Sequence, residues 1–374
     1  MRKFNGLFFK LLMLGLSTMI GIALAEVGVR LLRPQSLGVW VMTKDQMVVH
    51  RANIRGHTTI HGKRFETNSI GMRDLERKRT KATGSYRILL LGDSFMEATQ
   101  VEREDALPHL LEKNLAARLK QPVEVINLSV SGWGTDTQLA YFERHAFDYA
   151  PDLILIAMTL HNDISDNLAR QYHRIEAGEL HNIPQQDLPP LVALRQRTQE
   201  WLAGHSQFYQ LVVRNLPHRA RSQSETGRAL NHHVVDLLSA SPTSEIEQGW
   251  SLTRSLLNRF HDLAAQQGAD FAVFLIPLVY TVIDERLEEL LIENELARTD
   301  IDPLRPQRLM KRWGKGRNVQ IIDLQPEFHT WAESQNSDPY FTLDGHWNED
   351  GHRLAAELVA GELNAQRLLR HQME

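Results

Sequence analysis

The sequence predicts an α/β fold, a three-layer α/β/α sandwich around a central parallel sheet of about five strands. From residue 85 onward, short apolar runs alternate with segments of helical periodicity. These runs are apolar on both faces, as in strands that are covered by helices on both sides. An N-terminal apolar helix and a β-rich lead-in precede this pattern.

Five apolar runs are the expected strands of the sheet. They are residues 87–91 (RILLL), 123–130 (VEVINLSV), 152–159 (DLILIAMT), 271–277 (FAVFLIP) and 319–324 (VQIIDL). Helices are expected after an Asp105 N-cap, over 135–149 with Thr135 as N-cap, over 250–267, and over 353–368.

Composition and charge exclude several classes of protein. The 374 residues are 42% hydrophobic and carry a net charge of -4, which argues against a nucleic-acid partner. The chain has no cysteine, so disulfides, thiolate nucleophiles and cysteine-bound zinc are excluded. Its 17 histidines are scattered without ligand spacing, so we expect neither a metal site nor a cofactor.

The N-terminus reads as an export segment. Basic residues precede an uncharged run over residues 11–25, and residues 23–25 (ALA) offer a small-x-small cleavage site. Apolar residues continue past this point, and Glu26 and Arg30 lie one helical turn apart, where they can pair. We therefore favour an uncleaved, single-pass anchor in a bacterial inner membrane with a periplasmic catalytic domain. The alternative is a cleaved signal peptide and a periplasmic or secreted protein.

The chain divides into three predicted segments. They are an anchor over residues 1–33, a β-rich lead-in over 34–84, and a large domain over 85–374 with an insertion or lid at about 165–242. The insertion contains a helix-like stretch, 191–216, and a polar basic stretch, 219–228. For the helix-like stretch, packing on its own domain is favoured over lying on the membrane.

Candidate chemistry follows the strands, because ligands bind at the carboxyl ends of a parallel sheet. Ser94 follows the first strand at a glycine turn that exposes its hydroxyl, although helix capping is an equally good reading of this block alone. Gly132 and Asn162 follow the next two strands, where a glycine N–H and an amide can stabilise an oxyanion. His346 follows the last strand as a general base, with Asp344 to orient it.

Two competing assignments rank lower. A second Asp-Gly-His ends at His352, which we interpret as part of the closing helix rather than as the base. A metal cluster built from His161, Asp163 and Asp166 ranks lowest, because their spacing matches no regular ligand pattern.

Together, Ser94 in GDSF, Gly132, Asn162 in HND and His346 in DGHWN resemble the SGNH/GDSL hydrolase family over roughly residues 85–370. The resemblance implies a flavodoxin-like sheet. It also implies a Ser94–His346–Asp344 triad and an oxyanion hole made by the Ser94 N–H, the Gly132 N–H and the Asn162 amide. The Asp-x-His spacing, with Leu343 where the family usually has its acid, is similar to that of relatives that acetylate bacterial exopolysaccharides.

The expected function is a serine ester hydrolase that removes small acyl groups, chiefly acetyl, from a carbohydrate or another envelope ester. An O-acyltransferase acting on exopolysaccharide with the same triad is the alternative, and a lysophospholipase or thioesterase is a further one. A hypothesis of a different class is a non-catalytic subunit of a polysaccharide-assembly complex. Its basis is two departures from the family's usual pattern: Leu160 stands two residues before Asn162, where the family usually has a glycine, and Leu343 replaces the usual acid. The resemblance implies partners in polysaccharide biosynthesis.

Overall fold

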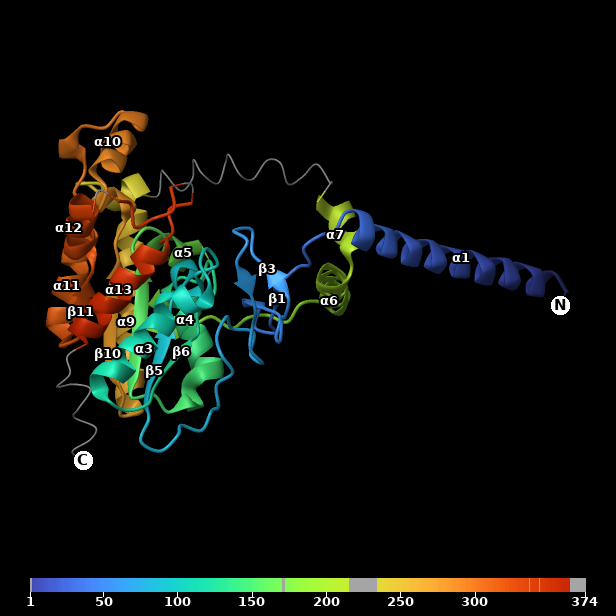
Figure 1. Cartoon of the computed structure of the whole chain (residues 1–374), viewed down its shortest axis with the longest axis horizontal. Helices are drawn as coiled ribbons and strands as arrows, with labels where there is room; N and C mark the ends of the chain where they lie inside the picture. Colours follow the sequence, from blue (N-terminus) through green and yellow to red (C-terminus); the bar gives the residue numbers. More distant parts are fainter. Residues whose placement is uncertain (1, 170–171, 215–233, 336, 343, 364–374) are drawn as a thin grey trace. The chain divides into compact units, whose positions relative to one another are not determined.

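A computed structural model describes residues 2–169, 172–214, 234–335, 337–342 and 344–363. These residues form two compact units (Figure 1). Unit 1 comprises Met1–Met42 and Gln186–Glu225, and unit 2 comprises Thr43–Gln185 and Thr226–Glu374. The predicted basic stretch 219–228 and the last part of the predicted helix 353–368 lie outside the described residues.

Unit 2 is built around a five-stranded parallel sheet of order β11-β10-β7-β5-β6, which confirms the predicted fold class. The strands are β5 (Tyr86–Leu91), β6 (Val123–Asn127), β7 (Leu153–Thr159), β10 (Asp270–Ile276) and β11 (Gln320–Asp323). All side chains of β5 and β7 are buried, as expected for central strands with helices on both faces. Predicted and observed strand bounds differ by three residues at most.

Helices cover both faces of the sheet. The helices of unit 2 are α2 (Ser94–Glu97), α3 (Leu107–Leu119), α4 (Thr135–Tyr141), α5 (Asp163–Ala169), α9 (Ser244–Gln266), α10 (Asp284–Glu293), α11 (Arg305–Arg317), α12 (Gln325–Gln335) and α13 (Glu349–Glu362). On one face, α3, α12 and α13 pack their apolar side chains against Ile88, Leu90 and Phe274. On the other, α9 stacks Phe260 on Phe271 of β10 and also contacts α4 and α11. The predicted three layers are therefore present.

Shorter elements connect these layers. They are the single turns η1 (Arg103–Asp105), η2 (Phe142–Ala146), η3 (Phe147–Tyr149), η5 (Val279–Thr281) and η6 (Arg298–Asp300), and the antiparallel hairpin of β8 (His173–Glu176) and β9 (Glu179–Asn182). The hairpin lies within the predicted insertion.

Two predicted N-cap residues are wrong, and the helices predicted over 250–267 and 353–368 begin earlier, at Ser244 and Glu349. Asp105 lies in η1, and Ala106 occupies the N-cap position of α3 without a side-chain bond. Gly134, not Thr135, occupies the N-cap position of α4. The predicted helix 135–149 also ends as an α-helix at Tyr141, where it widens into a π turn, η2.

The lead-in within unit 2 contains β2 (Val48–His50) and a hairpin of β3 (His57–Thr58) and β4 (Arg64–Phe65). A turn at Gly71 follows, with a φ of +80°; a Cβ there would lie 2.3 Å from the carbonyl oxygen of His50, so only glycine fits. The turn places Arg73 in the core, where its buried guanidinium donates to the backbone carbonyls of Glu97, Ala98 and Val101. The lead-in thus holds the end of α2.

Unit 1 contains α1 (Arg2–Leu32), β1 (Trp40–Met42), α6 (Pro190–His205) and α7 (Gln207–Arg214). By length and composition, residues Phe8–Leu32 of α1 are long and apolar enough to cross a membrane. The predicted Glu26–Arg30 pair is confirmed, with Arg30 Nε 2.7 Å from Glu26 Oε1. The helix-like stretch of the insertion forms α6 and α7, which belong to the same unit as α1 and not to the large domain as favoured from sequence.

Candidate active site

Ser94 is the first residue of α2 and follows the carboxyl end of β5. Asp93 is the N-cap of this short helix, and its buried side chain accepts a hydrogen bond from the Phe95 N–H at 3.0 Å. A Cβ on Gly92 would lie 2.6 Å from Met96 Cγ, so the chain can make this tight strand-to-helix turn only with glycine. Local packing therefore fixes the position of Ser94.

Ser94 and His346 lie within hydrogen-bond distance. His346 Nε2 is 2.7 Å from Ser94 Oγ, although the two residues are 252 positions apart in the chain. The ring of Phe95 packs against the His346 imidazole at a centroid distance of 4.9 Å. A nucleophile and a base in this relation can transfer a proton during attack on a carbonyl.

Asp344 lies close to the other ring nitrogen of His346. Its Oδ2 is 3.5 Å from His346 Nδ1, which is an ion-pair distance and too long for a good hydrogen bond. The backbone N–H of His346 donates to Asp344 Oδ1 at 3.1 Å. Burial raises the pKa of Asp344, but contacts with His346 and with the Gln100 amide outweigh it and hold the pKa at about 2. The carboxylate is therefore ionised beside the imidazole.

Two further side chains, which were not predicted from the sequence, contact Asp344. Gln100 Nε2 donates to Asp344 Oδ2 at 3.2 Å, and His61 Nε2 lies 3.5 Å from the same oxygen. His61 also stacks on Phe341 at a centroid distance of 6.2 Å. His61 comes from the β3–β4 hairpin, so the lead-in also reaches the region of the candidate triad.

Two of the predicted oxyanion residues, Gly132 and Asn162, are in different situations. Gly132 adopts a φ of +77° in the loop after β6, a conformation that glycine adopts readily. The Asn162 amide nitrogen donates to Asp93 at 3.3 Å and to Asp166 at 3.0 Å. In this state the Asn162 amide is therefore engaged by carboxylates rather than presented to a substrate oxygen.

The loop that carries Gly132 is tied to the nucleophile helix by Glu97. Glu97 Oε2 accepts a hydrogen bond from the Ser131 N–H at 2.5 Å, and Glu97 Oε1 lies 2.9 Å from His50 Nε2. Burial raises the pKa of Glu97, but His50 and Ser131 lower it below its ordinary value. No pattern in the sequence marks Glu97 for this position, because its partners come from β2 and from the loop after β6.

The residues of the lowest-ranked metal hypothesis do not gather. Asp163 is buried and accepts from the Thr159 N–H at 3.1 Å, and burial raises its pKa well above the usual range. His161 instead faces a cavity, and burial, with His346 nearby, lowers its pKa to about 4. Within the described residues, no group of three or more His, Asp or Glu side chains has an arrangement that could hold a metal ion.

His352, the second histidine considered, is part of the core. Its side chain is buried in α13, its Nδ1 accepts from the Leu107 N–H at 3.3 Å, and its ring meets Trp347 edge to face. Burial lowers its pKa to about 3, with smaller contributions from Arg73 and His346. This histidine links α3 to α13.

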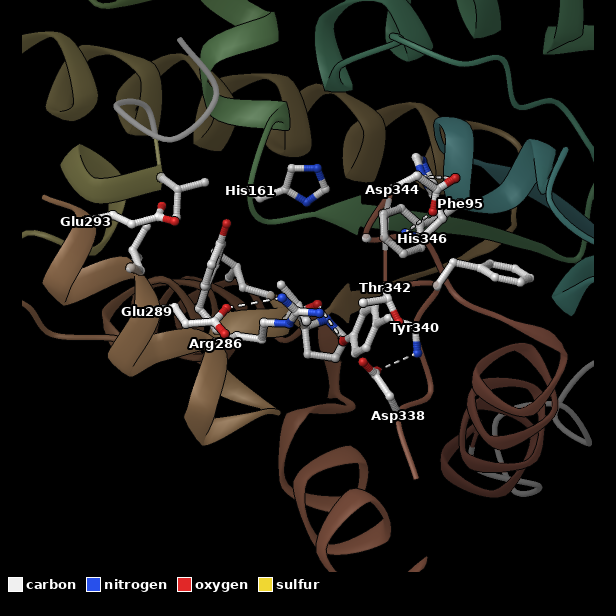
Figure 2. A pocket seen from close by; sticks show the side chains of 18 residues that line it. Phe95, His161, Arg286, Glu289, Glu293, Asp338, Tyr340, Thr342, Asp344 and His346 are labelled. Atoms are coloured by element: carbon white, nitrogen blue, oxygen red, sulfur yellow. Dashed lines mark hydrogen bonds and ion pairs between the residues drawn. The ribbon is translucent and has the colours of Figure 1, made fainter. Parts of the chain in front are cut away.

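A cavity of about 390 Å³ opens beside His346. Figure 2 shows Arg286 and Glu289 of α10 across the cavity from Asp344 and His346. Its aromatic lining residues are Phe95, Tyr280, Tyr340 and Phe341. The cavity is large enough for a small acyl group and part of a sugar ring, and aromatic faces are suited to contact with such rings.

Comparison with protein families agrees with the predicted resemblance, because part of the chain matches the model of an SGNH hydrolase-like domain. The matching family is described as "SGNH hydrolase-like domain, acetyltransferase AlgX", and the match covers residues 238–374. This segment includes Asp344 and His346, whereas Ser94, Gly132 and Asn162 precede it. A comparison with curated proteins gives no match.

Solved structures of two acetylxylan esterases and of TesA are distantly similar. The acetyl xylan esterase AlAXEase is 12% identical, with 74% of this chain and 100% of that chain covered and a TM-score of 0.41. A catalytic mutant of Axe2, an acetylxylan esterase from Geobacillus stearothermophilus, is 12% identical, with 76% and 96% covered and a TM-score of 0.41. TesA is 13% identical, with 77% and 100% covered and a TM-score of 0.36. With TM-scores below 0.5, these similarities do not bear on the activity of this chain.

Proposed function

We propose that unit 2 is a serine esterase that cleaves small acyl groups, chiefly acetyl, from a carbohydrate. Ser94 Oγ attacks the ester carbonyl while His346 Nε2 takes its proton, and Asp344 stabilises the imidazolium that forms. His346 then protonates the leaving sugar oxygen, which leaves an acyl-Ser94 ester. Water, deprotonated by His346, attacks this ester and releases the carboxylic acid and Ser94.

The single observation that supports this proposal most is the 2.7 Å contact between Ser94 Oγ and His346 Nε2. This contact joins Ser94, at the carboxyl end of β5, to His346, in the loop between α12 and α13, and His346 also lines the cavity. The Gly132 N–H, the Ser94 N–H and the Asn162 amide are proposed as the oxyanion donors. For Asn162 this requires its amide to turn from Asp93 and Asp166 toward the substrate.

Acyl transfer is the second candidate, and the description of the matching family as an acetyltransferase favours it. In transfer, a sugar hydroxyl replaces water in the second step, so that His346 deprotonates the acceptor alcohol and the acyl group moves to a new oxygen. The same residues serve both reactions. An envelope polysaccharide is the proposed acceptor, and polysaccharide-biosynthesis proteins are the proposed partners.

We also propose that α1 is retained as a single-pass anchor in a bacterial inner membrane, with unit 2 in the periplasm. Its length and apolar character support this assignment.

The test is release of nitrophenol from p-nitrophenyl acetate by the detergent-solubilised full-length protein. Ser94→Ala and His346→Ala are each expected to lower kcat by at least about 10³-fold, because the nucleophile or the base is lost. Ser334→Ala, which changes an exposed serine of α12, is the matched control and should leave kcat unchanged.

Equal rates for the intact protein and Ser94→Ala, together with no labelling of Ser94 by a fluorophosphonate, would contradict the esterase proposal. That result would favour the non-catalytic polysaccharide-assembly subunit. Transfer is distinguished by adding an oligosaccharide and measuring whether it gains acetyl groups faster than acetate is released.

A further inference from the structure

The C-terminal end of α1 is joined to α6 and α7 by charged side chains. Glu26 accepts hydrogen bonds from Ser206 Oγ at 2.8 Å and from the N–H groups of Gln207 and Phe208, each at 2.9 Å. These N–H groups begin α7 and have no partner within a helix, so the Glu26 carboxylate provides the hydrogen-bond acceptors at the N-terminus of α7.

Arg30 completes the same junction. It pairs with Glu26 at 2.7 Å and donates to the carbonyl oxygen of His205, the last residue of α6, at 2.9 Å. An anion thus meets the start of α7 and a cation meets the end of α6, each with the sign that the helix dipole favours. Both insertion helices are therefore held at one level along α1.

That level corresponds to the edge of a bilayer. Counting about 20 residues for the hydrocarbon core from Phe8, the first apolar residue of the candidate span, reaches Val27. Glu26 and Arg30 then lie where the core gives way to headgroups, and the junction with His205 and Gln207 lies there too.

Three exposed apolar side chains lie along one side of α6, whereas a fourth, Val192, is 48% exposed on another side. Leu191, Leu194 and Trp201 recur at spacings of three and seven residues, which places them along one side of the helix. Their side chains are 81%, 62% and 60% exposed. Exposed Arg195 and Arg197 flank this stripe on its two sides, where long cationic side chains can reach anionic headgroups.

We propose that α6 is an interfacial helix that lies on the bilayer crossed by α1. Its Leu191–Leu194–Trp201 stripe faces the boundary between headgroups and acyl chains, with Trp201 at the depth that tryptophan prefers. The partner of this surface is a lipid membrane containing anionic phospholipid. The inference rests on the proposed anchoring of α1 and is independent of the proposed esterase chemistry.

The test uses the absence of cysteine from the chain, because single cysteines can be labelled without background. Leu194→Cys and Trp201→Cys place a nitroxide on the stripe, and Gln199→Cys places one on an exposed position across the same helix. The full-length variants are reconstituted in nanodiscs of phosphatidylcholine and phosphatidylglycerol. Collision rates with oxygen, which concentrates in lipid, and with a water-soluble nickel chelate are then measured.

The expected result is that labels at positions 194 and 201 are protected from the nickel chelate and accessible to oxygen, while the label at 199 shows the reverse. Glu26→Gln, which weakens the junction, should move the signal at position 194 toward that of water. Equal nickel accessibility at all three positions overturns the proposal. Esterase assays on the same samples report separately on the proposed function.

Discussion

Glu97 offers a sharp test of how the site is held together. Its side chain is only 1% exposed, and it connects β2, the nucleophile helix α2 and the loop that carries Gly132. Glu97→Ala removes the carboxylate partner of both His50 and the Ser131 N–H. Loss of one member of a buried, charge-assisted pair is expected to lower the free energy of unfolding by about 3–5 kcal/mol.

Glu97→Gln should lower the free energy of unfolding by less, about 1–2 kcal/mol. The amide oxygen can still accept a hydrogen bond from the Ser131 N–H while the amide nitrogen faces His50. The activity should follow the same order. If the Gly132 N–H serves the oxyanion, a shift of its loop in Glu97→Ala should lower kcat by roughly 10²-fold with little change in KM.

Urea unfolding followed by tryptophan fluorescence, with p-nitrophenyl acetate turnover on the same samples, measures both effects. Glu104→Ala removes a partly exposed carboxylate of η1 and is the matched control, with an expected change of about 0.5 kcal/mol or less. If Glu97→Ala unfolds at the same urea concentration as Glu104→Ala and keeps its kcat, Glu97 does not hold the loop.

Two further predictions concern Asp344 and His352. Asp344→Asn should lower kcat by roughly 10²-fold. Gln100→Ala should lower kcat by less, because Gln100 acts only through Asp344. An unchanged kcat in Asp344→Asn would show that Asp344 has no part in the mechanism. Since the pKa of His352 is lowered to about 3, the unfolded state binds its proton below about pH 6.5 while the folded state does not. Stability should therefore fall with acidification between about pH 6 and 4, by about 1.4 kcal/mol per pH unit from this residue, and His352→Gln should reduce the slope in pH-dependent urea unfolding by that amount. An unchanged slope would show that another group binds the proton.

The sheet and the strand-end positions of the site were predictable because they depend on local patterns. A fully buried parallel strand has an apolar sequence, and the residue after it must lie at the carboxyl edge. This is why Ser94 could be expected at that edge. His346 was predicted to follow the last strand directly, but α12 lies between β11 and His346, so the contact between His346 and Ser94 depends on tertiary packing. The family match extends only over the second part of this pattern.

The remaining contacts could not be predicted because they join distant segments without a repeating pattern. His61 and Gln100 reach Asp344 from the lead-in and from the loop after α2, and no spacing relates them. Helix α10, which forms one wall of the cavity, was missed because its short apolar face is interrupted by acidic residues. The assignment of α6 to the N-terminal unit depends on Glu26, whose capping bonds to α7 span about half of the chain.

The contacts of the lead-in also bear on the order in which the chain can fold during synthesis. Lys63 pairs with Glu349 at 2.9 Å, and the two residues are 286 positions apart. Ribosomes release the lead-in early, yet its partners in the loop between α12 and α13 and in α13 emerge near the end. These contacts of the lead-in can therefore form only when almost all of the chain has been made. Such a delay suits the export that we propose for this chain, because a polypeptide passes through a narrow translocation channel before it closes into its native form.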